Sequence, residues 1–130
     1  MRILLYGSLD DYTQTIKCQD MVSELQYRRI ECTHASDFDT FLDDLRQNTY
    51  DFIVVTMNGA EGMEGVIAVQ KIKQNIDIVW FSDDAGFGVQ AHRFGCAYFS
   101  VKPITEESIS KAYHAIQKLH QSQWRNYNFT

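Results

Sequence analysis

The sequence predicts one α/β domain, a doubly wound sheet of five parallel strands with helices on both faces. Five short apolar runs recur along the chain, and between them apolar residues repeat at helical spacing. Strands that alternate with helices in this way pair in parallel through right-handed crossovers. The 130 residues suit a single domain, and the 45% apolar and 22% charged composition is that of a globular protein.

Each expected strand is a short run rich in apolar or β-branched residues. The run Arg2–Tyr6 ends at a glycine, and Asp51–Thr56 has the continuous apolar character of a central parallel strand. The five expected strands are Arg2–Tyr6, Ile30–His34, Asp51–Thr56, Ile76–Phe81 and Ala97–Val101.

Three of the five expected helices have a polar residue near their start that can cap the first turn. The candidate caps are Asp10 or Asp11, Ser36 or Asp37, and Thr105. The glycine-containing segment Met57–Gly62 is expected to be a loop. The expected helices are Asp11–Arg28, a short helix that closes near Asn48, Met63–Gln74, about 85–94, and Glu106–Gln121.

Charge, apolar run length and cysteine spacing argue against several classes of protein. The net charge is −5 with the acids spread along the chain, whereas nucleic acids and anionic membranes bind basic faces. No apolar run has the length of a transmembrane helix or a signal peptide. The cysteines are odd in number and have no CxxC spacing, which favours buried thiols in a reducing cytoplasm; they are Cys18, Cys32 and Cys96.

The chemistry of an open parallel sheet takes place at the carboxyl ends of its strands. The residues expected at that edge are Gly7, Ser8, Thr56, Ser82 and Lys102. The histidines lack metal-binding spacing, so we expect neither a metal nor a cofactor; they are His34, His92, His114 and His120.

Three segments resemble parts of response-regulator receiver domains of the CheY type. They are Tyr50–Val66, similar to the third strand and its loop, Ile76–Ser82, similar to the fourth strand, and Phe94–Ile109, similar to the fifth strand, Lys-Pro turn and last helix. The resemblance covers nearly the whole chain and implies the flavodoxin-like strand order 2-1-3-4-5. Within it, the spacing of Phe94, Tyr98 and Lys102-Pro103 is similar to that of receivers preceding LytTR DNA-binding domains.

The chain departs from the receiver pattern at the positions that carry its chemistry. Receivers place two acidic residues after the first strand, where this chain has Gly7 and Ser8. They end the third strand with the phosphoacceptor aspartate, where this chain has Thr56. Asn58 matches the loop residue whose carbonyl coordinates magnesium. The positions of the switch residues and the lysine are Ser82, Phe99, Lys102 and Pro103.

These substitutions change the expected charge of the site. Three carboxylates and one lysine give −2 in a receiver, whereas Lys102 without a carboxylate gives +1 here. Magnesium is held mainly by carboxylates, and the Thr56 hydroxyl needs a general base to act as a nucleophile. We therefore expect no aspartyl phosphorylation and no catalytic residue. Six other acids leave two alternatives open: they either restore a metal site, or they cap helices and face solvent. They are Asp10, Asp11, Glu61, Glu64, Asp83 and Asp84.

Three functions follow from this interpretation. The leading one is a pseudo-receiver, not an enzyme, that binds a protein partner or a second copy through about 85–121. The alternative is a sensor of a small anion or phosphorylated metabolite that uses Thr56, Ser82 and Lys102. If Lys102 has no such role and is only a remnant of the receiver pattern, its ammonium is expected to reach water. The third is an unconventional phosphorylated receiver or another enzyme.

The receiver-like domain is assigned to 1–121 and a tail or linker stub to 122–130. The tail aromatics Trp124, Tyr127 and Phe129 are expected to pack on the domain or on a partner. If an output domain follows residue 130, the protein is expected to regulate transcription, and any nucleic-acid contact would lie in that domain.

Overall fold

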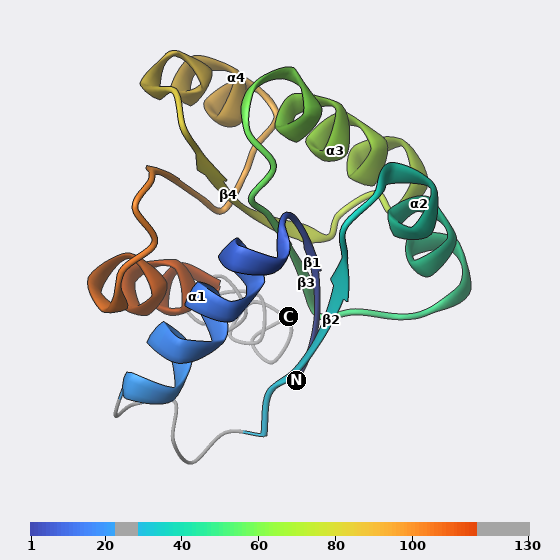
Figure 1. The fold of residues 1–130 in the computed structure, drawn as a ribbon. Coiled ribbons are helices and arrows are strands. Elements are labelled where there is room, and N and C mark those ends of the chain that lie inside the picture. Colours follow the sequence, from blue (N-terminus) through green and yellow to red (C-terminus); the bar gives the residue numbers. More distant parts are fainter. Residues whose placement is uncertain (23–28, 117–130) are drawn as a thin grey trace, which may run out of the picture.

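The computed structural model describes residues 1–22 and 29–116 and contains one five-stranded sheet (Figure 1). The strand order is β2-β1-β3-β4-β5, and every neighbouring pair is parallel. This confirms the predicted fold class and strand order. The strands are β1 (Arg2–Tyr6), β2 (Glu31–Ala35), β3 (Phe52–Val55), β4 (Asp77–Ser82) and β5 (Tyr98–Val101).

Helices follow each strand. They are α1 (Leu9–Met21), α2 (Phe38–Gln47), α3 (Gly59–Ile72), the 3-10 turn η2 (Ala85–Phe87) with α4 (Gly88–Arg93), and a last helix that includes residues 106–116. The prediction of one helix over 85–94 is therefore corrected to a 3-10 turn followed by a short α-helix. The first helix was predicted to run to Arg28, but α1 ends at Met21 because the backbone of Val22 is extended. Residue 28 itself, the predicted end of the last helix at Gln121, and the tail with its aromatics and His120 lie outside the described residues.

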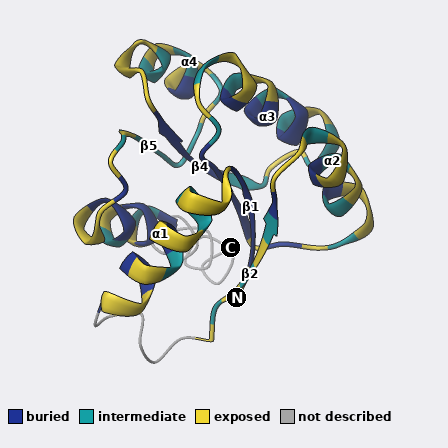
Figure 2. Ribbon diagram, in the orientation of Figure 1, coloured by how far each residue is buried: buried dark blue, intermediate teal, exposed yellow. Residues whose placement is uncertain are grey.

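The sheet separates two apolar layers because successive strand residues point to opposite faces. On β1, Ile3 and Leu5 face the layer that α1 and the last helix cover, whereas Leu4 and Tyr6 face α2, α3 and α4. The strands carry most of the fully buried side chains, and the central strands β1, β3 and β4 are largely dark blue in Figure 2, whereas β2 is more exposed. No helix within 1–22 and 29–116 is long and apolar enough to cross a membrane.

Two helix starts differ from the prediction. Ser8, not Asp10 or Asp11, caps α1, and its Oγ accepts a hydrogen bond from the Asp11 amide at 3.1 Å. Helix α3 begins at Gly59 rather than at residue 63, so the expected loop up to Gly62 is mostly helical. Its glycines allow close packing instead of a turn: a Cβ on Gly62 would stand 2.3 Å from the Met57 carbonyl oxygen. The predicted caps Asp37 and Thr105 are confirmed.

Candidate functional site

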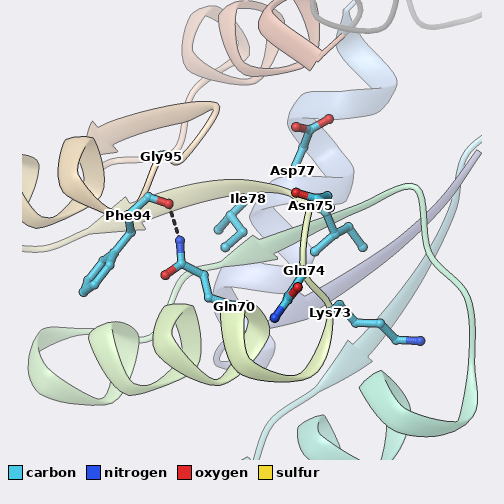
Figure 3. Close-up of a pocket in the computed structure, with 9 residues that line it drawn as sticks. Gln70, Lys73, Gln74, Asn75, Asp77, Ile78, Phe94 and Gly95 are labelled. Carbon is cyan, nitrogen blue, oxygen red and sulfur yellow. Dashed lines mark hydrogen bonds between the residues drawn. The ribbon is translucent and has the colours of Figure 1, made fainter. Parts of the chain in front are cut away.

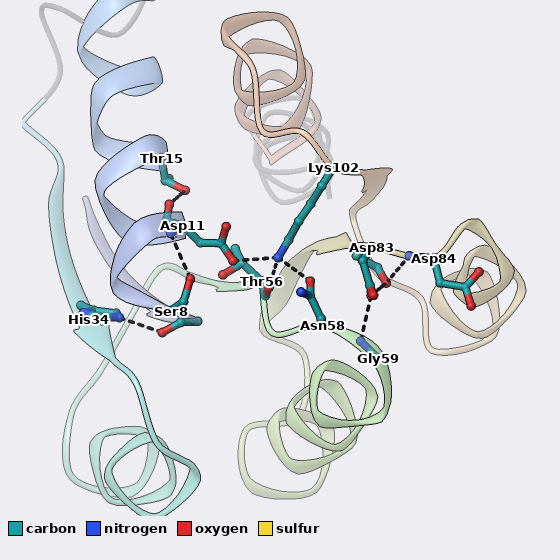
Figure 4. Close-up of polar contacts among 12 residues, drawn as sticks. Ser8, Asp11, Thr15, His34, Thr56, Asn58, Gly59, Asp83, Asp84 and Lys102 are labelled. Atoms are coloured by element: carbon teal, nitrogen blue, oxygen red, sulfur yellow. Dashed lines mark hydrogen bonds and ion pairs between the residues drawn. The ribbon is translucent and has the colours of Figure 1, made fainter.

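The residues predicted at the carboxyl edge of the sheet do lie there (Figure 4). Ser8 follows β1, Thr56 follows β3, and Lys102 follows β5. The Lys102-Pro103 peptide bond is cis, and the Lys102 amide donates to the Ser82 carbonyl at 2.8 Å. The Lys102 side chain extends from β5 across the edge toward β3 and α1. The edge is therefore spanned by this single lysine.

The Lys102 ammonium is bound by three oxygen atoms. Its Nζ donates to Asp11 Oδ2 at 2.7 Å, to the Thr56 carbonyl oxygen at 2.6 Å and to Asn58 Oδ1 at 2.6 Å. A protonated lysine has three N–H donors, so these three bonds use all of them. The Lys102 and Asp11 side chains are only 18% and 22% exposed. The pair is thus partly withdrawn from water, where a charge interaction is stronger than at an open surface.

This contact corrects the expected charge of the site. Asp11 adds −1 to the +1 of Lys102, so the pair has a net charge of zero, and the Lys102 ammonium is bound within the site instead of extending into water. The error arose from assigning Asp11 to the cap of α1. Because Ser8 takes that role, the Asp11 carboxylate is free to reach across the edge. Sequence reasoning also missed the Asn58 side chain as a ligand of the ammonium.

Thr56 is enclosed against the first strand. Its side chain is fully buried, and Oγ1 has no hydrogen-bond partner among the described residues. A Cβ atom at Gly7 would stand only 1.7 Å from Thr56 Oγ1. The hydroxyl is therefore packed against the Gly7 backbone and is closed to solvent.

His34 fixes the Gly7 backbone from the neighbouring strand. Its Nε2 lies 2.8 Å from the Gly7 carbonyl oxygen and, since a carbonyl only accepts, this nitrogen carries the proton. The His34 ring stacks on Tyr12 at 4.7 Å between centroids and 8° between planes. Sequence spacing gave no signal of this contact, because the three residues come from separate elements.

The described acids do not gather into a metal site. Within the described part of the chain, no group of three His, Cys, Asp or Glu residues is placed to hold a metal ion. Asp10, Glu61 and Glu64 are exposed. Asp83 Oδ1 accepts from the Gly59 amide at 2.9 Å, and Asp84 Oδ1 accepts from the Gly86 amide at 2.8 Å. Asp84 caps the 3-10 turn, as predicted, whereas Asp83 binds the start of α3.

No family model matches the sequence, and no curated protein matches it. Solved structures do match in fold. A CpaE2 pilus assembly protein from Sinorhizobium meliloti has a TM-score of 0.70 and 12% identity, covering 89% of this chain and 99% of that one. The response regulator TrrA from Thermotoga maritima, solved with Mg²⁺ and BeF, has a TM-score of 0.67 and 18% identity, covering 88% and 97%. The receiver domain of HemR from Leptospira biflexa has a TM-score of 0.69 and 18% identity, covering 88% and 93%.

This chain has the fold of a response-regulator receiver domain. The fold places Thr56, Ser82 and Lys102 at the ends of β3, β4 and β5, as the resemblance implied. The similarity to receivers that precede LytTR domains has no counterpart in these three structures and stays a prediction.

Two further receiver positions make local contacts. The Ser82 hydroxyl is buried, accepts from the Asp84 amide at 3.2 Å and lies 3.5 Å from Asp83 Oδ1, so it does not join Thr56 and Lys102 in one pocket. Phe99 packs edge-on against Trp80 with ring centroids 5.4 Å apart. Phe99 is therefore turned toward the layer of α4 rather than into solvent.

A separate hollow of ≈ 490 Å³ lies at the other end of the strands, near the amino end of β4 (Figure 3). It is formed where α3 ends and β4 begins, and the Gln70 side-chain amide donates across it to the Phe94 carbonyl. Lys73 and Gln74 line its rim. Because open parallel sheets bind ligands at the carboxyl edge, this hollow is not the candidate site.

Proposed function

We propose that this chain is a pseudo-receiver, a protein-interaction domain of bacterial signal transduction that is held in one state without phosphorylation. The observation that supports it best is the Lys102 ammonium saturated by Asp11, Asn58 and the Thr56 carbonyl. A receiver binds a divalent ion and a phosphoryl group at this edge of the sheet, and an ammonium whose three donors are already used there supports a site that accepts neither.

Magnesium would bind poorly at this edge. It prefers carboxylate oxygens, and the Asp11 carboxylate, which contacts Lys102, already neutralises that ammonium. A metal ion would have to displace the ammonium and break three hydrogen bonds. Thr56 could not replace an aspartate as the phosphoryl acceptor, because its buried hydroxyl has no base within the described residues to take its proton.

We place the partner surface on α4, β5 and the last helix. This part of 85–121 is described up to residue 116, and it exposes two large apolar side chains, Val89 at 58% and Val101 at 40%. Within the described residues, β5 is an edge strand that pairs with β4 alone. Apolar side chains beside an open edge favour contact with another protein. The proposal therefore includes a protein partner bound at this surface and a role in cytoplasmic signalling. If an output domain follows this one, the protein would control transcription through that domain.

The alternative of an anion sensor has less support. An anion at Thr56, Ser82 and Lys102 needs free donors, yet the ammonium protons are used, the Thr56 hydroxyl is buried, and the Ser82 hydroxyl lies within its own loop. The change in melting temperature on adding phosphate tests this alternative. The pseudo-receiver hypothesis predicts that any such change is the same in the wild type and in Lys102→Ala. A stabilisation lost only in Lys102→Ala would favour the sensor.

Intact mass spectrometry tests the proposal directly. The chain is incubated with Mg²⁺ and acetyl phosphate, beside the TrrA receiver as a positive control. We expect TrrA to gain a phosphoryl group and this chain to keep its mass. A stoichiometric phosphoryl adduct on this chain would reject the pseudo-receiver assignment.

The partner surface needs a separate test. Val89→Asp places a charge on the proposed face at α4, away from the Lys102 site, and Val101→Asp places one on β5, next to Lys102 in the chain. If a partner recovered with the wild-type chain is released by both variants, the face is correct, and retention of the partner by both would move the surface elsewhere.

A further inference from the structure

We propose that two copies of this chain associate through the groove between α2 and α3, a surface separate from the one assigned above. The two helices lie side by side over one face of the sheet (Figure 1). The groove between them has a volume of ≈ 500 Å³. Phe38 and Leu42 from α2 and Ile67 and Ile72 from α3 line it, and all four side chains are half-buried. Such a contiguous apolar surface open to water favours burial against another protein surface.

Charged residues lie at the margin of this groove in a definite order. Glu64 and Lys71 both line it from α3 and both are exposed. They are separated by two helical turns, so they lie on the same side of α3, about 10 Å apart along its axis. Arg46, in the last turn of α2, also lines the groove. Because α2 and α3 run in the same direction from the carboxyl edge, the groove is positive toward their carboxyl ends and negative near Glu64.

This order of charges is complementary to itself. Ile67 and Ala68 lie midway between Glu64 and Lys71 on α3. A twofold axis through that midpoint, perpendicular to α3, places Glu64 of one copy opposite Lys71 of the other, and symmetry repeats the pair. Ala68 is small, so the two α3 helices can approach closely over the apolar floor. A second copy of the chain therefore supplies the charge pattern that the groove requires.

Analytical ultracentrifugation of the full chain tests this interface over a range of concentrations up to about 1 mM, the weak end of specific association. We expect a dimer that is weakened by salt, because its charged margin is screened. Lys71→Glu and Glu64→Lys should each raise the dissociation constant about tenfold or more, since symmetry makes each reversal repel twice. The double variant E64K/K71E exchanges the two charges and should restore association to near the wild-type value.

Two controls separate this interface from the surface on α4 and β5. Lys111→Glu makes the same charge change as Lys71→Glu but lies on the last helix, and Val89→Asp disrupts the other surface; both should leave the dimer intact. Circular dichroism confirms that each variant is folded. A monomeric wild type, a double variant that fails to recover, or a dimer lost only in Val89→Asp would each overturn the inference. The last outcome would leave the proposed function standing.

Discussion

Thr56 Oγ1 occupies the position that a side chain at residue 7 would need, since a Cβ atom there would stand 1.7 Å from that oxygen. Gly7 and Thr56 directly follow the neighbouring strands β1 and β3, and the resemblance to receivers predicts an acidic residue and the phosphoacceptor at these two positions. Their substitutions are therefore coupled: the threonine side chain fits in this orientation only beside glycine. Restoring an acidic side chain at position 7 alone would force Thr56 or the strand to move.

Gly7→Ala is expected to destabilise the domain by about 2 kcal/mol, because it adds a methyl group to a closed space. Urea denaturation measures the loss. Combination with Thr56→Ala should recover part of it by removing Oγ1. The matched control is Gly88→Ala, whose Cβ would meet only Phe99 at an ordinary 3.5 Å. A Gly7→Ala variant as stable as wild type would contradict the coupling.

Thr56→Val is expected to change the free energy of unfolding by no more than about 1 kcal/mol. The shape of the side chain is nearly conserved, and the hydroxyl that is lost has no hydrogen-bond partner among the described residues. Denaturant unfolding of the two proteins side by side gives the difference. A loss of about 2 kcal/mol or more would mean that the hydroxyl is bonded in solution.

Either Asp11→Asn or Lys102→Met breaks the Asp11–Lys102 ion pair and is expected to lower the free energy of unfolding by about 2 kcal/mol. This is less than for a fully buried pair, because both side chains are partly exposed. The double variant should lose about 1 kcal/mol less than the sum of the single losses. Glu107 and Lys111 form an exposed i,i+4 pair on the last helix and serve as the control, with no measurable coupling expected. If the loss in the double variant equals the sum of the two single losses, the ion pair does not contribute to stability and this prediction is wrong.

The half-buried thiols Cys32 and Cys96 are expected to be unreactive in the folded protein at pH 8. Burial raises the pKa of each to about 12, and only the thiolate is a nucleophile. Labelling with a chromogenic disulfide should be slow for the native chain and rapid in urea. The same shift predicts that stability falls as pH rises from the ordinary thiol pKa near 9 toward 12, because the unfolded chain ionises first. Fast native labelling of either cysteine would contradict this.

The fold could be predicted because its signals are local. The strand Phe52–Val55 is a continuous apolar run, and the caps Asp37 and Thr105 precede periodic helices. The predicted start of helix α3 is too late because Gly62 resembles a loop residue in sequence, whereas Gly65 lies inside both the predicted and the observed helix. In the structure they are contact points, where a side chain would meet Met57 or Tyr6.

The site could be predicted only in part. The positions of Thr56, Ser82 and Lys102 followed from strand ends, but the partner of Lys102 did not. Asp11 is 91 residues away in the chain, and its role depends on Ser8 having taken the helix cap. Which of several neighbouring acids reaches a distant cation is decided by side-chain geometry, which no spacing rule records.

The most direct test of a site that accepts neither a divalent ion nor a phosphoryl group is a Mg²⁺ titration followed by ¹H–¹⁵N NMR, with and without beryllofluoride. The backbone amides of Thr56, Asn58 and Gly59 report on the loop, and the Lys102 ammonium reports on the ion pair. Our account predicts no saturable shift at these residues and a Lys102 ammonium that remains hydrogen-bonded throughout. A saturable shift centred on Thr56 and Asn58, together with release of the ammonium, would contradict it.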